Sequence, residues 1–562
     1  MYIGIDVGGT CTDAVLLDRG TVRAMAKVST REDLLLTLLE ALDEVMKGIN
    51  GELIERVVFS TTVITNLIAE KKYDPVGLIL MPGPGLNPNL YRFPTDTYII
   101  QGAIDYRGRE IIPLRLAEVD RVAEELAARG YRKVAVVGKF SCRNHRHEKE
   151  VAARLRWNYP NWHIEEGHQV AGQLNFPRRV VSTYLTCATR EKYQFFVRSI
   201  QEAISQRGIK GGVFILKADG GTLPLESSLE VPVETIFSGP AASTLGVQAL
   251  MPPGESAVVV DVGGTTTDLA LILSGQPLLA SRGVRVDDML THVRALAVKS
   301  VPVGGDSVVE RVGKDIIIYS ERLGAPYCLG GPVPTPTDAL RVLGLTRLGD
   351  AERAREAMQI LGEPLGLSPA EVASQVTGKV IETIVQEIEN MFTRWEQEPA
   401  YRVWEVLQKK KVRPSTVVGV GGGAAGFISQ IAARLGGYPV IPPYAPVANA
   451  IGAAVARPTL QVTLRADTEQ GFYIIQEEGY QGKITDHSFN EEKALELAKE
   501  WLCRRASRYG LEDCVEGLEV IRREVFNMVR DWVTVGRLFD VTVQTRRGIL
   551  YHVGGGGYRH EK

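Results

Sequence analysis

One fifteen-residue pattern occurs twice in this chain and limits what the chain can fold into. Residues 3–17 read IGIDVGGTCTDAVLL, and residues 258–272 read VVVDVGGTTTDLALI. In both copies a hydrophobic run ends in an aspartate, a Gly-Gly-Thr turn follows, and a second apolar run begins after Thr-Asp. Short apolar runs bounded by glycines are typical of buried strands, so each copy predicts a β-hairpin with a tight turn. Two copies of one unit indicate two similar half-molecules.

The turn of each hairpin has the composition of a phosphate-binding loop. Glycines allow backbone N–H groups to approach a ligand closely, and threonine hydroxyls add further donors. Asp6 and Asp261 end the first strand of each copy. Like charges repel, so these aspartates suit Mg²⁺ or its bound water better than a phosphate. A single copy is equally consistent with a glycine turn capped by an aspartate, whereas two facing copies predict a nucleotide clamp.

Two further glycine-rich segments are candidates for contact with a nucleotide. An apolar run at 416–420 is followed by Gly421-Gly422-Gly423 and by helical spacing over 424–435, and Val303-Gly304-Gly305-Asp306 precedes another expected helix. A Rossmann site is disfavoured for the first segment, because no acidic residue follows at the usual interval within a clear βαβ unit. The sequence contains no GxxxxGK[ST] motif, which excludes a P-loop.

Composition narrows the class of protein. With 562 residues, 44% of them hydrophobic, the chain is too long for one ordinary domain, and its strands alternate with helices, which favours an α/β fold. A net charge of −2 predicts no nucleic-acid partner, and no apolar run of about 18 residues predicts a membrane span. Six cysteines without a CxxC pair, and an N-terminus that begins directly with a strand, lead us to expect a cytoplasmic protein.

Several other segments, in this order, carry a family resemblance. They are FSTTVITNLIAEK (59–71), FSCRNHRHE (140–148), KADGGTLPL (217–225), ETIFSGPAAS (234–243), LGAPYCLGGPVPTPTDALRVLG (323–344) and VGGGAAGFISQIAARLGGYPVIPP (420–443). Together with the two hairpins they resemble the hydantoinase/oxoprolinase A-type family, within the actin/heat-shock-chaperone/sugar-kinase superfamily of ATPases. The resemblance covers roughly residues 1 to 457.

The resemblance implies an architecture and an activity. We expect two RNase-H-like (actin-like ATPase) domains, residues 1–175 and 176–457, around a nucleotide cleft, and an α+β appendage over 458–562. The implied activity is ATP-dependent hydrolysis of a cyclic amide, such as a hydantoin or 5-oxoproline, by phosphorylation of the amide oxygen. Two alternatives stay open: the ATPase subunit of a ketone carboxylase, and an ATP-gated activator or scaffold. A separate B-type subunit and an oligomer are also expected.

The resemblance also assigns site residues. Asp6 and Asp261 would be catalytic and would hold Mg²⁺, directly or through water, while Asp13 and Asp268 would cap their own turns. The expected nucleotide-binding residues are Gly8, Gly9, Thr10, Thr12, Gly263, Gly264, Thr265, Thr266, Thr267, Gly304, Gly305, Gly421, Gly422 and Gly423. Thr61, Thr62, Asn66 and Asp219 are candidates to line the substrate pocket, although the first three are also consistent with ordinary turn and helix positions.

The chain departs from the family pattern at two places. Where relatives read His-Gly-Thr-Thr this chain has Phe59-Ser60-Thr61-Thr62, and where they often read Ser-His-Glu it has Gly167-His168-Gln169. Among the other polar residues, Asn144 is expected to cap a helix, His147 and Glu148 to point in different directions, and His168 and His292 to lie on the surface.

Overall fold

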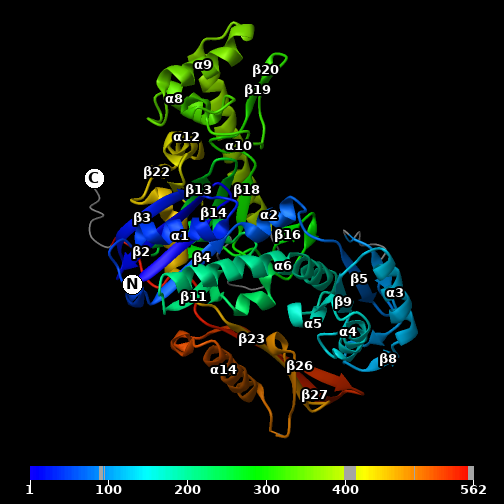
Figure 1. Cartoon of the computed structure of the whole chain (residues 1–562). Helices are drawn as coiled ribbons and strands as arrows, with labels where there is room; N and C mark the ends of the chain where they lie inside the picture. Colours follow the sequence, from blue (N-terminus) through cyan, green and yellow to red (C-terminus); the bar gives the residue numbers. More distant parts are fainter. Residues whose placement is uncertain (88–92, 94, 398–412, 487, 555–562) are drawn as a thin grey trace.

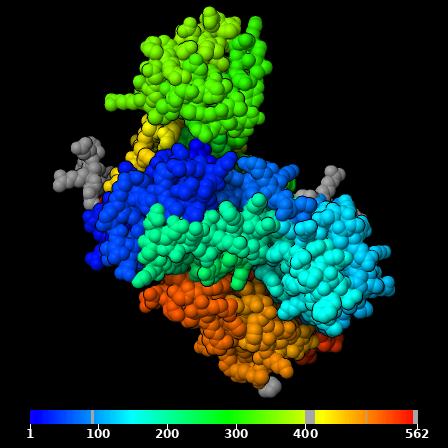
Figure 2. Space-filling view, in the orientation of Figure 1, coloured from blue at the N-terminus to red at the C-terminus, as the bar shows by residue number. Residues whose placement is uncertain are grey.

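The computed structural model describes residues 1–87, 93, 95–397, 413–486 and 488–554. Two six-stranded sheets form the centre of the molecule, and three lobes project from them (Figures 1 and 2). Each central sheet contains one copy of the repeated hairpin, which therefore organises the whole fold.

The first sheet has the strand order β12-β11-β4-β1-β2-β3. The first hairpin is its centre, because β1 pairs antiparallel with β2 and parallel with β4. The bounds are β1 Tyr2–Val7, β2 Cys11–Asp18, β3 Thr21–Ser29, β4 Arg56–Thr61, β11 Gly212–Leu216 and β12 Thr222–Pro224, with helices α1 Leu34–Val45, α2 Val63–Ala69 and α6 Phe176–Gln206. This sheet continues past residue 175, the boundary predicted from the sequence, because β11 and β12 belong to it.

The second sheet repeats this arrangement. Its order is β15-β14-β13-β21-β22, with β18 also paired to β14, and β13 again runs antiparallel to the next strand and parallel to a later one. The bounds are β13 Ala257–Val262, β14 Thr267–Leu273, β15 Gln276–Pro277, β18 Val298–Val301, β21 Thr416–Val420, β22 Tyr438–Val440 and α12 Ala424–Leu435. The duplicated α/β architecture predicted from the repeated hairpin is confirmed.

Two helices connect the sheets and cross each other closely. They are α7, Ser238–Leu250, and α13, Ala448–Val455. A Cβ added at Gly246 of α7 would lie 1.9 Å from the Ala448 carbonyl oxygen, and one at Gly452 of α13 would lie 1.9 Å from that of Ala242. Only glycine permits such an approach of two backbones, so these residues determine how the two halves are joined.

The three lobes are built from insertions and from the C-terminal part. The first carries the parallel sheet β10-β9-β5-β6, the second a hairpin with three helices, and the third a five-stranded antiparallel sheet covered by α14 (Figure 1). The elements of the first lobe are β5 Val76–Met81, β6 Thr97–Ile99, β7 Ala103–Ile104, β8 Glu110–Ile112, α3 Leu116–Ala128, β9 Lys133–Gly138, α4 Arg146–Asn158, β10 His163–Glu166 and α5 Gly167–Val170. Those of the second lobe are β19 Val309–Val312, β20 Asp315–Ile318, α8 Pro336–Val342, α9 Ala351–Gly362 and α10 Pro369–Gln397. Those of the third lobe are β23 Gln461–Asp467, β24 Phe472–Ile475, β25 Tyr480–Lys483, α14 Glu491–Arg508, β26 Glu519–Arg530 and β27 Val533–Gln544. The third lobe combines a five-stranded sheet with α14, and the domain bounds 458–562 stay a prediction.

Two short strands, β16 Arg285–Val286 and β17 Met289–Leu290, pair as a separate hairpin. Within the described residues, no helix is both long and apolar enough to cross a membrane.

Candidate nucleotide site

The two hairpin turns have the same backbone geometry. The N–H of Gly8 donates to the Cys11 carbonyl at 3.1 Å, and the N–H of Gly263 donates to the Thr266 carbonyl at 2.9 Å. At the tips, Gly9, Thr10 and Thr266 are exposed, as a loop that contacts a ligand must be. The sequence repeat therefore corresponds to a structural repeat of the turn itself.

Four aspartates lie together beneath these turns. Asp6 on β1 is the register partner of Asp13 on β2, and Asp261 on β13 is the partner of Asp268 on β14. Burial raises the pKa of Asp6 to about 6, and the carboxylates of Asp13 and Asp261 contribute to this increase. Burial, followed by the charge of Asp261, raises the pKa of Asp268 to about 7. The mutual effects place both pairs in one electrostatic environment.

The expectation that Asp13 and Asp268 only cap their own turns is wrong. Both lie within strands, and the side chain of each belongs to the shared carboxylate group. Lys27 Nζ on β3 forms an ion pair with Asp13 Oδ1 at 2.6 Å. A cap would bond to its own loop, whereas these side chains alternate across a pleated strand and therefore face their partners.

The two catalytic candidates are anchored by the two crossing helices. Asn449 on α13 donates from Nδ2 to Asp6 Oδ2 at 2.6 Å and to Asp13 Oδ2 at 3.2 Å. On α7, the Ser243 hydroxyl donates to Asp261 Oδ2. Burial raises the pKa of Asp261, and the Ser243 hydrogen bond opposes this increase. Each carboxylate is thus fixed by a residue that also belongs to the connection between the halves.

The second hairpin is supported by two further glycine segments. The N–H groups of Gly305 and Asp306 donate to the carbonyls of Gly263 and Gly264 at 2.9 and 2.6 Å. Gly421 has a φ of +83°, and a Cβ added there would lie 2.3 Å from Asp261 Oδ1. The structure therefore places both segments against the second hairpin, with Gly304 and Gly305 at its turn and Gly421 at Asp261.

Other predicted residues lie beside the first hairpin. Thr62 Oγ1 donates to the Val7 carbonyl at 3.3 Å, and the Cβ position of Gly9 is 3.5 Å from Asn66 Nδ2. Thr12 and Thr267 were also expected to bind the nucleotide, but both side chains are fully buried. The hydroxyl of Thr12 bonds to Thr30 at 3.0 Å and that of Thr267 donates to the Val303 carbonyl at 2.7 Å, so both hydroxyls are used inside the protein.

Two of the proposed substrate residues do not face the hairpins. Thr61 is fully buried, and its hydroxyl accepts from the Val63 N–H at 3.0 Å at the start of α2. Asp219 lies after β11, where its carboxylate accepts from the Gly221 N–H at 3.0 Å and lies 3.5 Å from Lys217 Nζ. Asp219 lines a separate cavity and is not part of the carboxylate group.

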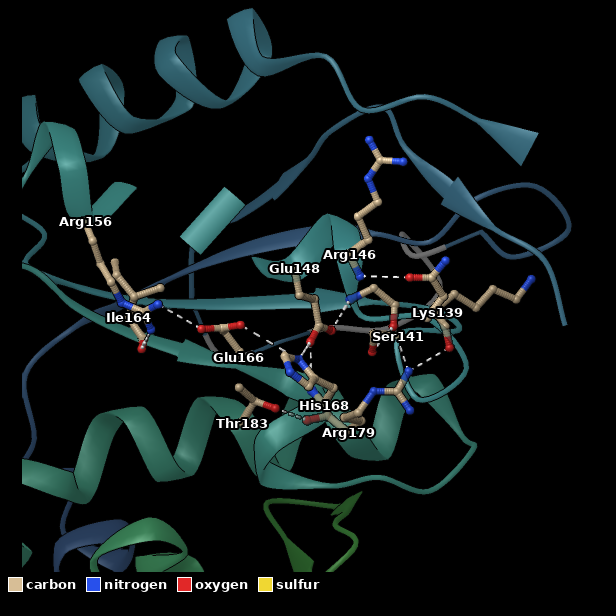
Figure 3. Close-up of polar contacts among 12 residues, drawn as sticks. Lys139, Ser141, Arg146, Glu148, Arg156, Ile164, Glu166, His168, Arg179 and Thr183 are labelled. Carbon is tan, nitrogen blue, oxygen red and sulfur yellow. Dashed lines mark hydrogen bonds and ion pairs between the residues drawn. The ribbon is translucent and has the colours of Figure 1, made fainter. Parts of the chain in front are cut away.

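A buried polar cluster occupies the lobe of β5 and β9 (Figure 3). Glu148 accepts from the Gly138 N–H at 2.7 Å and from His168 Nδ1 at 2.6 Å, and Arg179 Nη2 donates to the Gly138 carbonyl at 2.7 Å. The expectation that His168 lies on the surface is wrong, because the side chain is 5% exposed and pairs with a fully buried carboxylate. These bonds hold the end of β9 against α5 and α6.

The neighbouring polar residues are structural as well. Asn144 Oδ1 accepts from the Arg146 N–H at 3.0 Å, one residue before His145, which is the N-cap of α4 and has no capping side-chain bond. His147 points away from Glu148 and bonds to Glu110 at 2.7 Å. His292 lies in a loop, where its ring nitrogen lies 3.2 Å from the Asn175 carbonyl oxygen, and burial lowers its pKa to about 4.

The carboxylate group is compatible with a hydrated divalent cation. Asp6 Oδ1 is buried without a hydrogen-bond partner, and burial together with neighbouring carboxylates raises the pKa of Asp6 and of Asp268. Within the described part of the chain, no three His, Cys, Asp or Glu side chains converge as a metal cage. Mg²⁺ suits this arrangement, because it commonly takes one or two carboxylates and completes its shell with phosphate oxygens and water.

Comparison with known proteins identifies the family of this chain. The hydantoinase/oxoprolinase family model matches residues 179–462, and the model of the N-terminal region of that family matches residues 2–158. Caprolactamase subunit alpha from Pseudomonas jessenii is 25% identical over 78% of this chain and 68% of its own length. Acetophenone carboxylase gamma subunit from Aromatoleum aromaticum is 26% identical over 69% of this chain; the matched region spans 60% of that subunit.

Two solved structures share the fold of nearly the whole chain. Nucleotide-free acetone carboxylase has a TM-score of 0.76 at 18% identity and covers 97% of this chain and 88% of its own. ATP-dependent caprolactamase from Pseudomonas jessenii has a TM-score of 0.70 at 20% identity and covers 98% of this chain and 88% of its own. Because the two family models together match residues 2–158 and 179–462, the chain belongs to the hydantoinase/oxoprolinase family.

Proposed function

We propose that this chain is an ATP-dependent enzyme that acts on a small cyclic amide, such as a hydantoin or 5-oxoproline. The observation that carries the proposal is the pair of matched hairpins with their four aspartates, of which Asp6 and Asp13 are buried and Asp261 and Asp268 half-buried. Family membership and the likeness to a caprolactamase subunit support the same reaction class.

The chemistry explains why ATP would be needed. An amide carbonyl is a poor electrophile, so its oxygen first attacks the γ-phosphorus of ATP, and the bond to ADP breaks. Water then adds to the imidate carbon, and the tetrahedral carbon expels the ring nitrogen, which takes up a proton as the ring opens. A second water hydrolyses the acyl phosphate that remains to a carboxylate and free phosphate. Phosphoryl transfer depends mainly on positioning and on neutralising charge, both of which preorganised turns can supply.

The described residues suggest a division of roles. The turn at Gly8–Thr10 would hold one side of the phosphates and the turn at Gly263–Thr266 the other, while Gly421–Gly423 would approach the nucleoside. Asp6 and Asp261 would hold Mg²⁺, directly or through water, and the ion would neutralise phosphate charge. Asn449 and Ser243 would keep these two carboxylates in place, because each already donates to one of them.

A ketone carboxylase subunit is the second candidate. The acetophenone carboxylase relative and the acetone carboxylase fold favour it, and the same clamp would phosphorylate an enolate or bicarbonate. Both curated relatives are named as subunits, so we also propose a separate partner subunit of the B type. The cytoplasmic location predicted from the cysteines stays a prediction.

Phosphate release from Mg-ATP tests the proposal. The purified chain is assayed alone, with 5-oxoproline, hydantoin and caprolactam, and with acetone or acetophenone plus bicarbonate. Asp261→Asn is the control, since it removes the charge of a catalytic candidate and should abolish stimulation. Stimulation by cyclic amides is expected; stimulation only by a ketone with bicarbonate would favour the second candidate. Tight ATP binding without turnover would mean that the proposed partner subunit completes the active site or that the chain is an ATP-gated switch.

A further inference from the structure

A cavity of about 240 Å³ lies at the end of the second sheet that is remote from the hairpin turn. Ile272, near the end of β14, borders it, and β14 spans roughly 20 Å between the turn and the cavity. Residues 546–552, which follow β27, form one wall. We propose that this cavity binds inorganic phosphate. The inference does not depend on the reaction proposed above, because the described residues that line the cavity include none from either hairpin turn.

The charged side chains that line this cavity are mainly cationic. Arg457, Arg546 and Arg547 all border it. Among the described lining residues the acidic one is Glu255, and it is exposed to solvent. Arg457 donates from Nε to the Ile549 carbonyl at 2.7 Å, so a backbone group, which carries no net charge, holds its guanidinium. The cavity therefore has an excess of positive charge that an anion would balance.

Arg547 supplies the donor that most clearly lacks a partner. The side chain is half-buried, and its Nε is buried without a hydrogen bond. Burial, followed by the charge of Arg294, lowers the pKa of Arg547, although Asp219 and Glu519 oppose this effect. A buried donor without a partner is unfavourable, and an anion beside it would remove that cost. Phosphate suits an arginine, because two guanidinium N–H groups match two phosphate oxygens.

A second unpaired atom favours phosphate over other anions. Gln248 on α7 is 7% exposed; its Nε2 donates to the Gly275 carbonyl at 2.8 Å, while its Oε1 is buried without a partner. Because the Gly275 carbonyl fixes which way the amide points, Oε1 remains an acceptor that needs a donor. At neutral pH, hydrogen phosphate carries one hydroxyl donor besides its acceptor oxygens, whereas sulfate and carboxylates carry none. Hydrogen phosphate therefore matches both the unpaired donor and the unpaired acceptor.

The backbone holds these two side chains next to each other. A Cβ added at Gly548, the residue after Arg547, would lie 3.5 Å from Gln248 Nε2 and 3.9 Å from its Oε1. Gly548 has a φ of +97°, a conformation that residues with side chains rarely adopt. A cavity of about 150 Å³ can hold benzene, so one of about 240 Å³ accommodates a phosphate ion together with bound water.

The wall formed by residues 546–552 belongs to a segment that contacts both halves of the molecule. The N–H of Leu550 donates to the Val455 carbonyl at the end of α13 at 2.7 Å. A few residues later, the N–H of Gly554 donates to the Gly20 carbonyl between β2 and β3 at 3.0 Å. Phosphate bound to Arg547 would hold this segment in place, and by mass action it would raise the stability of the folded chain.

Titration calorimetry tests the proposal. Phosphate binding to the full chain is measured in the presence of a saturating non-hydrolysable ATP analogue with Mg²⁺, which would fill the site at the hairpins. Arg547→Met should weaken phosphate binding at least tenfold and Arg546→Met several-fold, because each removes a charged donor. Arg198→Met, which replaces an exposed arginine on α6, is the matched control and should bind like the native chain. Cooperative thermal unfolding verifies that each variant is folded.

Two other anions test the choice of ligand. Sulfate should bind the native chain at least tenfold more weakly than phosphate, and Gln248→Met should remove this difference, because the acceptor for the phosphate hydroxyl is then lost. Glycerol phosphate should also bind more weakly than free phosphate, since the dianion of a monoester has no hydroxyl on phosphorus.

Several outcomes would overturn the proposal. They are the absence of binding at millimolar phosphate, unchanged binding in folded Arg547→Met and Arg546→Met, and loss of binding when the nucleotide analogue is present, which would place the phosphate at the hairpins. Equal binding of sulfate would reject the role of Gln248, and tighter binding of glycerol phosphate would reject the free ion as the ligand. A phosphate-dependent rise in unfolding temperature in the native chain, absent in Arg547→Met, would support the cavity. No readout requires ATP turnover, so failure of the proposed reaction is distinguished from failure of this inference.

Discussion

Replacing Gly421 by alanine should disable the nucleotide site through direct contact with Asp261. The new Cβ would lie 2.3 Å from Asp261 Oδ1 and 2.6 Å from the Val262 carbonyl oxygen. Cβ atoms are essentially never found within 3.0 Å of another heavy atom, so the carboxylate must move by at least about 0.7 Å. That movement would break the hydrogen bond from Ser243.

The expected magnitude follows from these contacts. A hydrogen bond to a charged group contributes about 1.5–3 kcal/mol, so its loss should weaken Mg-ATP binding on the order of 10- to 100-fold. Alanine at positive φ costs a further ~1–2 kcal/mol of stability, since Gly421 has a φ of +83°. The affinity is measured by titration calorimetry and the stability by denaturant unfolding.

Gly436→Ala separates the two effects. Gly436 follows α12 with a φ of +67°, and nothing lies within 4 Å of its Cβ position. This variant should lose a similar amount of stability but bind Mg-ATP like the native chain. If Gly421→Ala also bound Mg-ATP with native affinity, the placement of this glycine against the catalytic carboxylate would be refuted.

Three further substitutions test other parts of the site. Asp268 has a folded pKa of about 7 against an ordinary value of 3.8, so the native state holds its proton more tightly and stability falls as the pH rises from about 4 to 7. Asp268→Asn should flatten this fall in unfolding experiments, while exposed Asp288→Asn should not. Ser243→Ala should raise the pKa of the catalytic carboxylate on β13 and shift the acidic limb of the activity profile to higher pH; Ser199→Ala, whose hydroxyl bonds within α6, should leave the profile unchanged. Thr265→Val should weaken nucleotide binding by ~1 kcal/mol, and unchanged affinity by calorimetry would reject the assigned contact.

Local patterns in the sequence determined most elements of the fold. The apolar run at 416–420 is β21, and the helical spacing over 424–435 is α12. The repeated hairpin predicted both turns and the pair Asp6 and Asp261, because strand alternation and glycine turns depend on residues close together in the chain.

Only the tertiary structure decided which other residues join the site. Asn449 lies 443 positions from Asp6, and Ser243 reaches Asp261 only because α7 crosses α13. No periodicity encodes a contact over such a separation, so the sequence offered no signal for either residue beyond the small residues around them. The same reason explains why His168 is buried and why Asp219 lies at a cavity away from the hairpins. These placements result from packing between segments that are distant in the chain, and no single segment specifies that packing.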